Sequence, residues 1–257
     1  MKQNFDIIDV TSANVDQTGF FCYMSKRKEP GYKQKREWLE ERFAEGMKLK
    51  ILHEHGARDR AFIEYIPGEY AWRAIHAPGY LVIHCLWVVG QGKGKGYGTR
   101  LLKECLADAK AQGKRGVVMV SSDGNWLAGK KLFLKNGFVE IDQAPPAFQL
   151  LVHRFGESPL PAFPKDWEKR QAAFGCGLSV VRTTQCPYNE NAAKALMESA
   201  SAKGIPARVV ELQSAREVQK SAPCAYGTFA IVYDGKLFSY TYMTATDIEK
   251  RIKEIGG

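Results

Sequence analysis

The sequence has no hydrophobic run long enough to cross a membrane and no hydrophobic segment behind a charged N-terminus. Its longest apolar stretch, Tyr80–Val89, contains His84 and falls well short of the about 20 residues that a membrane-spanning helix needs. The chain begins Met1-Lys2-Gln3-Asn4, without the apolar core of a secretion signal. From these absences we expect a cytoplasmic protein with no membrane partner.

Paired cysteines are also missing. None of the six cysteines has the C-x-x-C spacing of a zinc ribbon, so we expect no metal site, and in a cytoplasmic chain such cysteines are reduced thiols. The six are Cys22, Cys85, Cys105, Cys176, Cys186 and Cys224.

Acidic residues are outnumbered by basic ones, and repeats and low-complexity tracts are absent. The chain has 257 residues with a formal net charge of +9. A basic surplus can serve a nucleic acid, an acidic membrane or a phosphorylated ligand, or it can simply keep the surface soluble. No motif combines aromatic and basic residues in the way of nucleic-acid-binding proteins, so a nucleic acid is the least favoured of these partners.

The pattern of apolar residues predicts two α/β units. In the first unit, 1–155, we expect strands over 5–10, 49–52, 61–66, 80–89, 117–120, 138–141 and 148–155, and helices over 32–47, 99–112 and 126–135. A connector over 156–175 is rich in proline and charge, and Trp167 is expected to anchor it. In the second unit, 176–257, we expect strands over 178–182, 207–212, 228–233 and 237–242, and helices over 186–203, 215–220 and 246–255.

A glycine-rich run, Gly90–Gly98, joins the buried strand at 80–89 to the helix at 99–112. Glycines let a backbone approach a ligand closely, and successive N–H groups at a helix N-terminus bind phosphate oxygens. Lys93 and Lys95 add positive charge. The run does not match the Walker or the G-x-G-x-x-G dinucleotide pattern. It therefore predicts a phosphate site of another class.

The spacing that fits is that of the Gcn5-related N-acetyltransferase (GNAT) superfamily, whose signature is Arg/Gln-x-x-Gly-x-Gly/Ala after a strand. The run Lys93-Gly94-Lys95-Gly96-Tyr97-Gly98 resembles it with Lys93 at the first position, and a second register begins at Gln91. We prefer the first register because Leu101-Leu102 then fall where the helix of the superfamily buries its first apolar pair. The segment Leu132–Phe138 resembles the second motif of the superfamily, and the resemblance extends to about residue 155.

The resemblance implies a GNAT fold, a mixed and splayed sheet with helices, that uses acetyl-CoA to acylate an amine directly. It also implies that backbone groups of Val88 and Val89 bind the pantetheine arm and that the glycine run binds the pyrophosphate. The cofactor-binding residues expected on this basis are Val88, Val89, Lys93, Gly94, Lys95, Gly96, Tyr97, Gly98 and Thr99.

The resemblance also implies that the usual general acid of the superfamily is missing from its position. Phe133 stands where the superfamily usually has the tyrosine that protonates the leaving thiolate, so the acid is absent, moved to Tyr97, Ser121 or Ser122, or unnecessary. A base that deprotonates the amine is also needed.

Three residues are candidates for the base. They are Glu64, Glu69 and His84. Glu64 lies in the apolar strand 61–66 and is either on the solvent face or buried, and burial would raise its pKa toward a useful value. His84 is either a catalytic group or a satisfied core histidine. We favour Glu64.

The second unit resembles a thioredoxin or glutaredoxin, because Cys186-Pro187-Tyr188-Asn189 is similar to the glutaredoxin C-P-Y-C motif with Asn189 in place of the second cysteine. A cysteine at a helix N-terminus is activated as a nucleophile, so Cys186 is a candidate catalytic residue. Gly227 occupies the position of the cis-proline of that fold, and a Cys186–Cys224 redox pair is one hypothesis. The combination of both units resembles bacterial N-acetyltransferases of the YoaP type.

Two functions follow. The favoured one is acetyl-CoA-dependent transfer to a primary amine of a small-molecule or peptide acceptor, with the second unit shaping or recruiting that acceptor. The alternative is a thiol-redox protein that acts through Cys186 and binds CoA in its first unit. The acceptor and the oligomeric state stay open, as does whether Tyr70, Trp72 and Tyr80 line the acceptor site or belong to the core.

Overall fold

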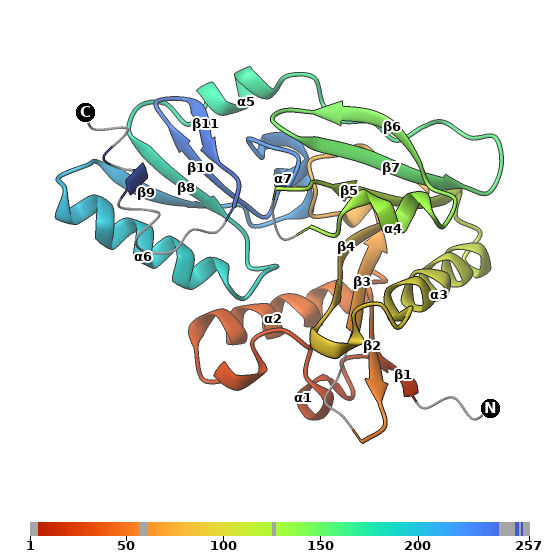
Figure 1. Ribbon diagram of the computed structural model, residues 1–257. Helices are drawn as coiled ribbons and strands as arrows, with labels where there is room; N and C mark the ends of the chain where they lie inside the picture. Colours follow the sequence, from red (N-terminus) through yellow and green to blue (C-terminus); the bar gives the residue numbers. More distant parts are fainter. Residues whose placement is uncertain (1–4, 57–60, 125–126, 242–249, 252, 254–257) are drawn as a thin grey trace.

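The computed structural model describes residues 5–56, 61–124, 127–241, 250–251 and 253, which form two sheets (Figure 1). The first sheet contains β1 (Phe5–Val10), β2 (Lys48–Glu54), β3 (Ala61–Pro67), β4 (Leu81–Val88), β5 (Gly116–Ser121), β6 (Val139–Ala144) and β7 (Phe148–Arg154). The second contains β8 (Leu178–Arg182), β9 (Ala207–Glu211), β10 (Phe229–Tyr233) and β11 (Lys236–Ser239). The α-helices are α1 (Val15–Thr18), α2 (Pro30–Ala44), α3 (Tyr97–Ala111), α4 (Lys130–Leu134), α5 (Trp167–Ala172), α6 (Asn189–Ala202) and α7 (Ala215–Ser221).

The first sheet has the order β1-β2-β3-β4-β5-β7-β6, and its neighbouring strands are antiparallel except for the parallel pair β4 and β5. This pair is short, because only Leu81–Ile83 of β4 are in register with Val117–Met119 of β5. Both strands continue further, β4 alongside β3 and β5 alongside β7. They therefore diverge beyond Ile83, as expected for a splayed sheet.

A β-bulge lies in the middle of β4. The register of β3 and β4 shifts between the pairs Glu64–Cys85 and Tyr65–Ile83, which leaves His84 as the extra residue. A bulge changes the direction in which neighbouring side chains point. It is the local feature that lets consecutive residues of β4, His84 and Cys85, line the same cavity.

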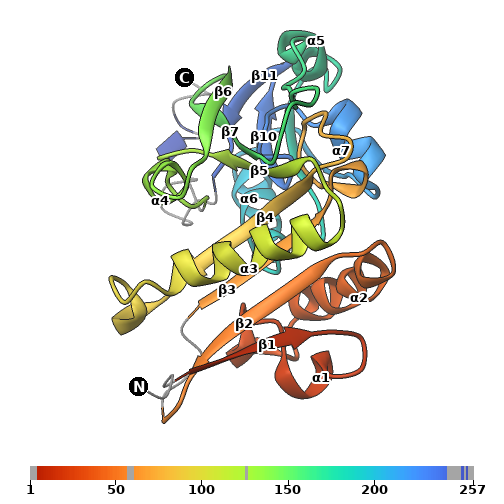
Figure 2. The same ribbon diagram turned by 90° about the vertical axis from the view of Figure 1, so that its right-hand side faces the viewer.

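Helices α2 and α3 cover opposite faces of β3, because alternate residues of a strand point to opposite sides. The hydroxyl of Tyr65 donates to Asp108 of α3 at 2.5 Å, whereas Glu64 contacts Lys35 of α2. In Figure 2, α3 crosses the strands in front and α2 lies beside β2 and β3. Every residue of β3 is buried as a result.

The second sheet has the order β11-β10-β8-β9, with β8 and β9 parallel and the other pairs antiparallel. Helix α6 packs on β8 and β9, and it also contacts α2 of the first part of the chain. The helix expected over 246–255 lies largely outside the described residues.

The connector between the sheets is packed rather than extended. The backbones of His76 and Ala162 form a two-bond bridge, and the hydroxyl of Tyr80 donates to the carbonyl of Pro159 at 2.8 Å. Trp167 at the start of α5 is buried, as predicted. The helix predicted over 126–135 is shorter than expected, because Lys130–Leu134 is the helical part of the described residues 127–135.

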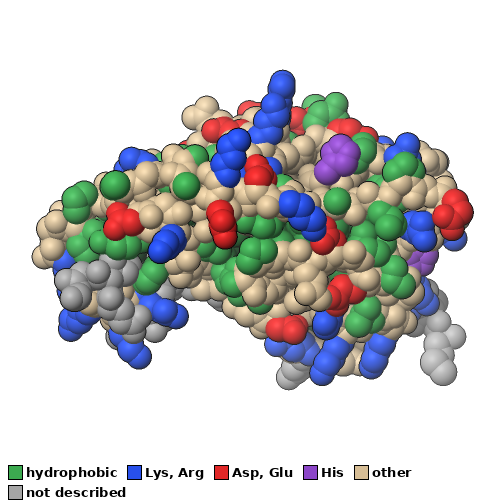
Figure 3. All heavy atoms as spheres, turned by 90° about the horizontal axis from the view of Figure 1, so that it is seen from above, with side chains coloured by type: hydrophobic (Ala, Val, Ile, Leu, Met, Phe, Trp, Pro, Cys, Tyr) green, Lys and Arg blue, Asp and Glu red, His purple; other side chains and the backbone are tan. Residues whose placement is uncertain are grey.

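Basic and acidic side chains are interspersed on the face that contains β6, β11 and α5. Figure 3 shows this face with Lys and Arg side chains spread among Asp and Glu side chains and no single basic patch covering it. Among the described helices, none is both long enough and apolar enough to span a membrane.

Candidate active site

The glycine run forms an open turn between β4 and α3. After a short 3-10 helix at Gly90–Gly92, Gly94 and Gly96 adopt φ of +82° and +80°, a conformation that side chains disfavour. A Cβ added at either position would meet no atom within 4 Å, so both glycines border open space. Gly96 caps α3, whose first N–H groups have no partner within the helix. This geometry suits a phosphate group.

Other residues of the run have defined neighbours. The ammonium of Lys95 lies 2.8 Å from a carboxylate oxygen of Glu54, and Lys93 is exposed. Tyr97 is buried, with its ring 5.9 Å from that of Phe5, and it does not line the cavity described next.

Gly98 and Thr99 are in the first turn of α3. A Cβ at Gly98 would lie 3.3–3.5 Å from side chains of Leu86, Val88 and Leu132, so this glycine allows α3 to pack closely on β4. The backbone of Val88 and Val89, beyond the point where β4 and β5 diverge, is free of β5 pairing in this part of the described sheet.

A cavity of about 250 Å³ lies between the two sheets, against the diverging part of β4. Cys85 and Trp87 of β4 and Val89, which follows β4, line it from the first part of the chain, together with Glu64 of β3. Gln185, Cys186, Pro187, Tyr188, Tyr226 and Thr228 line it from the second part. Two of the predicted catalytic residues on separate strands, Glu64 and His84, thus meet Cys186 at one cavity.

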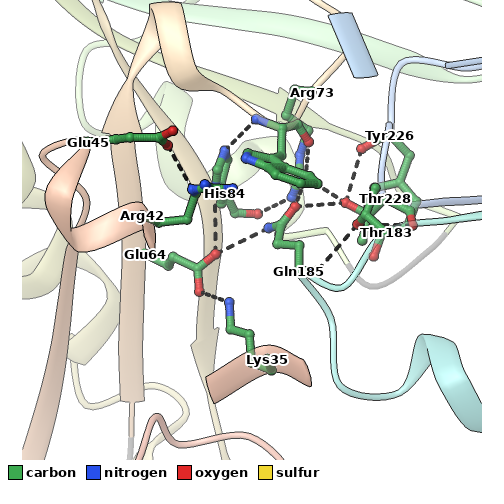
Figure 4. Close-up of polar contacts among 11 residues, drawn as sticks. Lys35, Arg42, Glu45, Glu64, Arg73, His84, Thr183, Gln185, Tyr226 and Thr228 are labelled. Carbon is green, nitrogen blue, oxygen red and sulfur yellow. Dashed lines mark hydrogen bonds and ion pairs between the residues drawn. The ribbon is translucent and has the colours of Figure 1, made fainter. Parts of the chain in front are cut away.

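Glu64 is at the centre of a buried polar network (Figure 4). Its Oε2 accepts a hydrogen bond from Nζ of Lys35 at 2.6 Å, and its Oε1 accepts one from Nε2 of Gln185 at 3.2 Å. Nδ1 of His84 lies 3.4 Å from the same Oε1. Glu64 is 2% exposed, so the interpretation that places it on a solvent face is wrong.

The predicted upward shift of the pKa of Glu64 is also wrong, because the net shift is downward. Burial alone does act in the upward direction, but the ammonium of Lys35 and the contact with His84 outweigh it and lower the pKa to about 2. Glu64 is therefore ionised throughout the neutral range. The reason could not be read from the strand itself, because Lys35 belongs to another element.

His84 is a neutral, fully buried side chain. Its Nε2 accepts a hydrogen bond from the backbone N–H of Trp72 at 2.9 Å, which assigns the ring proton to Nδ1. Burial lowers the pKa of His84 to about 4, against an opposing effect of Glu64. Neither ring nitrogen is available to accept a proton, so this histidine fits the core interpretation better than the role of a base.

Arg73 connects the two parts of the chain and is 2% exposed. Its Nη1 donates to Oε1 of Gln185 and to Oγ1 of Thr228, both at 2.7 Å, and its Nη2 donates to the carbonyl of His84. Gln185 thus bridges Arg73 and Glu64. The second part of the chain completes the environment of the carboxylate.

Gly227 shows how closely the two parts approach. Its φ is +71°, and an added Cβ would lie 3.1 Å from Cα of Arg73 and 3.2 Å from the carbonyl oxygen of Trp72. The backbone of the first part occupies the space beside this position, so a side chain would separate the two parts.

The thiols are distributed unevenly. Cys22, Cys85 and Cys186 line the cavity, whereas Cys224 is buried outside its lining and burial raises its pKa to about 11. All described cysteines are free thiols. Cys186 precedes the first turn of α6, where its carbonyl accepts a hydrogen bond from Asn189. Among the described residues, no His, Cys, Asp or Glu cluster has the geometry of a metal site.

The other predicted candidates lie outside the cavity. Glu69 is exposed and accepts a hydrogen bond from the N–H of Gly79, so it holds a turn. Ser121 donates to the carbonyl of Ala128, and Ser122 accepts from Gly124. Phe133 is buried against Phe138. Trp72 and Tyr80 belong to the core, and Tyr70 is exposed.

Sequence reasoning missed Lys35, Arg73 and Gln185. A signal existed for Lys35, because it precedes Trp38 by three residues and Leu39 by four and so lies on the apolar face of α2. Arg73 and Gln185 carry no comparable pattern, since both lie in irregular segments. The phenols that line the cavity, Tyr188 and Tyr226, were also not predicted as site residues.

Known proteins resemble the chain at two levels. Residues 19–138 match the acetyltransferase (GNAT) family. The chain is 34% identical over 252 residues to the uncharacterized N-acetyltransferase YoaP of Bacillus subtilis (strain 168), covering 96% of this chain and 98% of that protein.

Solved structures resemble it less closely. A GNAT-family acetyltransferase from Staphylococcus aureus Mu50 aligns with a TM-score of 0.45 and 14% identity over 59% of this chain and 99% of its own. The acetyltransferase yncA of Salmonella typhimurium, solved with acetyl-CoA, aligns with a TM-score of 0.45 and 15% identity over 62% of this chain and 98% of its own. The match over 19–138 and the near full-length relative show that the chain belongs to the GNAT family of N-acetyltransferases.

Proposed function

We propose that the chain transfers an acetyl group from acetyl-CoA directly to a primary amine bound in the cavity between its two parts. The observation that carries the proposal is the position of Glu64. Its ionised carboxylate is buried at the cavity, next to the segment of β4 that diverges from β5. This arrangement supports Glu64 as the proton acceptor of the reaction.

The glycine run provides a cradle for the diphosphate of the donor. Gly94 and Gly96 leave open space, and the N–H groups at the start of α3 supply donors for phosphate oxygens. Val88 and Val89 would bind the pantetheine arm through their backbone. When bound, acetyl-CoA supplies an activated acyl group with a thiolate as leaving group.

Glu64 takes the proton of the amine late in the reaction. A carboxylate with a pKa of about 2 cannot remove a proton from an ammonium ion to a useful extent. The amine therefore binds in its neutral form and attacks the thioester carbonyl. As the carbon–nitrogen bond forms, the nitrogen becomes strongly acidic, and Glu64 can then accept its proton. A thiolate leaves without prior protonation, which agrees with Phe133 at the usual tyrosine position.

We also propose that the chain divides at the boundaries expected from the sequence, with 1–155 as the acyltransferase domain and 176–257 as a thioredoxin-like domain. The order β11-β10-β8-β9 and the helices α6 and α7 support that topology. A thiol-redox function at Cys186 is the second candidate, because Cys22 and Cys85 line the same cavity. Thiol–disulfide activity that is lost in Cys186→Ser, without acetyl transfer to any amine, would favour it.

The dependence of kcat/KM on pH tests the proposed chemistry. With acetyl-CoA and a panel of primary amines, we expect kcat/KM to rise about tenfold per pH unit up to the pKa of the amine. Glu64 and His84, with pKa values of about 2 and about 4, keep one protonation state above pH 6, so neither adds an inflection. An inflection of kcat/KM between pH 6 and 8 that does not correspond to the pKa of the amine would contradict the proton route. If no amine of the panel is acetylated, the function itself is contradicted.

A further inference from the structure

The cavity has an apolar wall to which both parts of the chain contribute. Phe20, Phe21, Phe62 and Trp87 come from the first part, and Pro187, Tyr188 and Tyr226 come from the second. The polar side chains, Glu64 among them, gather on the network beside β3 and β4. The lining is therefore amphipathic, with a carboxylate on one side and aromatic rings elsewhere.

The wall from the second part is fixed to the first part by direct contacts. A Cβ on Gly31 of α2 would lie 2.1 Å from the carbonyl oxygen of Pro187, so the Cys186–Tyr188 segment rests on the helix backbone. The ring of Tyr188 packs edge-on against Tyr23 at 4.8 Å between centroids. Nδ2 of Asn191 donates to the hydroxyl of Tyr23 at 2.5 Å. These contacts hold the wall from the second part in a fixed position against the first part.

The backbone beside Phe21 is strained. Phe21 and Tyr23 are non-glycine residues with φ of +75° and +61°. Such conformations cost on the order of 1–3 kcal/mol each and persist where the surroundings fix them. The strained turn directs the Phe21 ring onto Phe62, 4.7 Å away, and into the cavity lining.

The charged and amide side chains of the lining are engaged with one another or with Thr228. Lys35 and Gln185 both donate to Glu64, and Arg73 donates to Thr228. An acceptor rich in hydroxyl groups or charges would lose its hydration against the aromatic wall without regaining hydrogen bonds. The volume of about 250 Å³ is below the about 300–1,000 Å³ typical of drug-sized ligands.

We propose that the acceptor is a small primary amine whose body is a single aromatic ring or an apolar group of similar size. The amine lies toward Glu64, and the body lies between Phe21 and the Cys186–Tyr188 segment. This inference rests on the proposed function for the transfer step, but it makes a separate claim about what the cavity binds.

A comparison of amines tests the claim. With acetyl-CoA in excess, we expect kcat/KM for 2-phenylethylamine to exceed that for ethylamine, glucosamine and a lysine-containing peptide by about tenfold or more, because burying a ring-sized apolar group is worth at least that factor.

The matched variant is Phe21→Asn, since asparagine tolerates positive φ and removes the ring. It should raise KM for 2-phenylethylamine about tenfold or more and lower kcat/KM for ethylamine by a clearly smaller factor, because ethylamine has no ring to pack against Phe21. Val209→Asn, at an exposed position on β9 outside the cavity lining, is the control and should change neither.

The outcomes separate this inference from the proposed function. Acetylation of glucosamine or the peptide as efficiently as 2-phenylethylamine overturns the inference and leaves the function standing, as does an equal loss for both amines in Phe21→Asn. If calorimetry shows binding of 2-phenylethylamine, Phe21→Asn abolishes this binding and no amine is acetylated, the inference is supported and the proposed function is refuted. If 2-phenylethylamine is neither bound nor acetylated, the inference is overturned.

Discussion

Replacing Glu64 with glutamine is expected to lower kcat by about a hundredfold or more while leaving the Kd for acetyl-CoA unchanged. Glutamine has the shape of glutamate but cannot accept the proton that the nitrogen releases. The donor is held elsewhere, by the glycine run and the start of α3, so its binding does not depend on this side chain. Steady-state kinetics and calorimetry with acetyl-CoA measure the two quantities.

The same substitution removes a charge from a buried ion pair. The side chain of Lys35, which is 4% exposed, would lose the carboxylate that lies 2.6 Å from its ammonium. Breaking such a buried pair by removing one partner typically costs about 3–5 kcal/mol. A loss of activity in Glu64→Gln could thus reflect partial unfolding.

The double variant Lys35→Met with Glu64→Gln separates the two effects. Removing both charges should restore most of the free energy of unfolding, because apolar replacement of a whole buried pair is often neutral. Activity should stay at the level of Glu64→Gln. A double variant that regains both stability and turnover would show that Glu64 has a structural role only.

Replacing Arg73 with methionine is expected to lower the free energy of unfolding by about 3 kcal/mol or more and to abolish acetyl transfer. The guanidinium connects Gln185 and Thr228 of the second part with the backbone of His84 in the first. Each buried polar group left without its partner costs about 1–3 kcal/mol. Gln185 would also lose the bond that orients it toward Glu64.

Urea denaturation followed by tryptophan fluorescence measures this effect. Arg216→Met, at an exposed position on α7, is the matched control and should stay within about 0.5 kcal/mol of the unmodified chain. If Arg73→Met retains both its unfolding midpoint and its turnover, the contact between the two parts is not needed for the active site.

The elements could be predicted because their signals are local. Alternating and buried apolar runs gave β1, β3, β4 and β5 close to their observed bounds, and the glycine run marked the start of α3 within two residues. Local signals failed at α4, where the helical pattern at 126–135 corresponds to a helix of five residues. A short helix at a surface depends on its packing partners more than on its own sequence.

The chemistry of the site could be predicted only in part. Glu64 was a candidate because a carboxylate in an apolar strand is unusual, and the structure places it at the cavity. The direction of its pKa shift depends on Lys35, which lies 29 residues earlier, and its orientation depends on Gln185, which lies 121 residues later. Such contacts exist only in the folded chain, so no pattern along the sequence contains them.

Calorimetric titration of the purified chain with acetyl-CoA tests the central claim most directly, since every proposed step needs this donor at the glycine run. The account predicts saturable binding at one site per chain, weakened about tenfold or more by Gly96→Val, because a branched side chain disfavours φ of +80° and would fill the open space beside the turn. If acetyl-CoA produces no heat of binding and CoA displaces no acetyl-CoA from the chain, the account is contradicted.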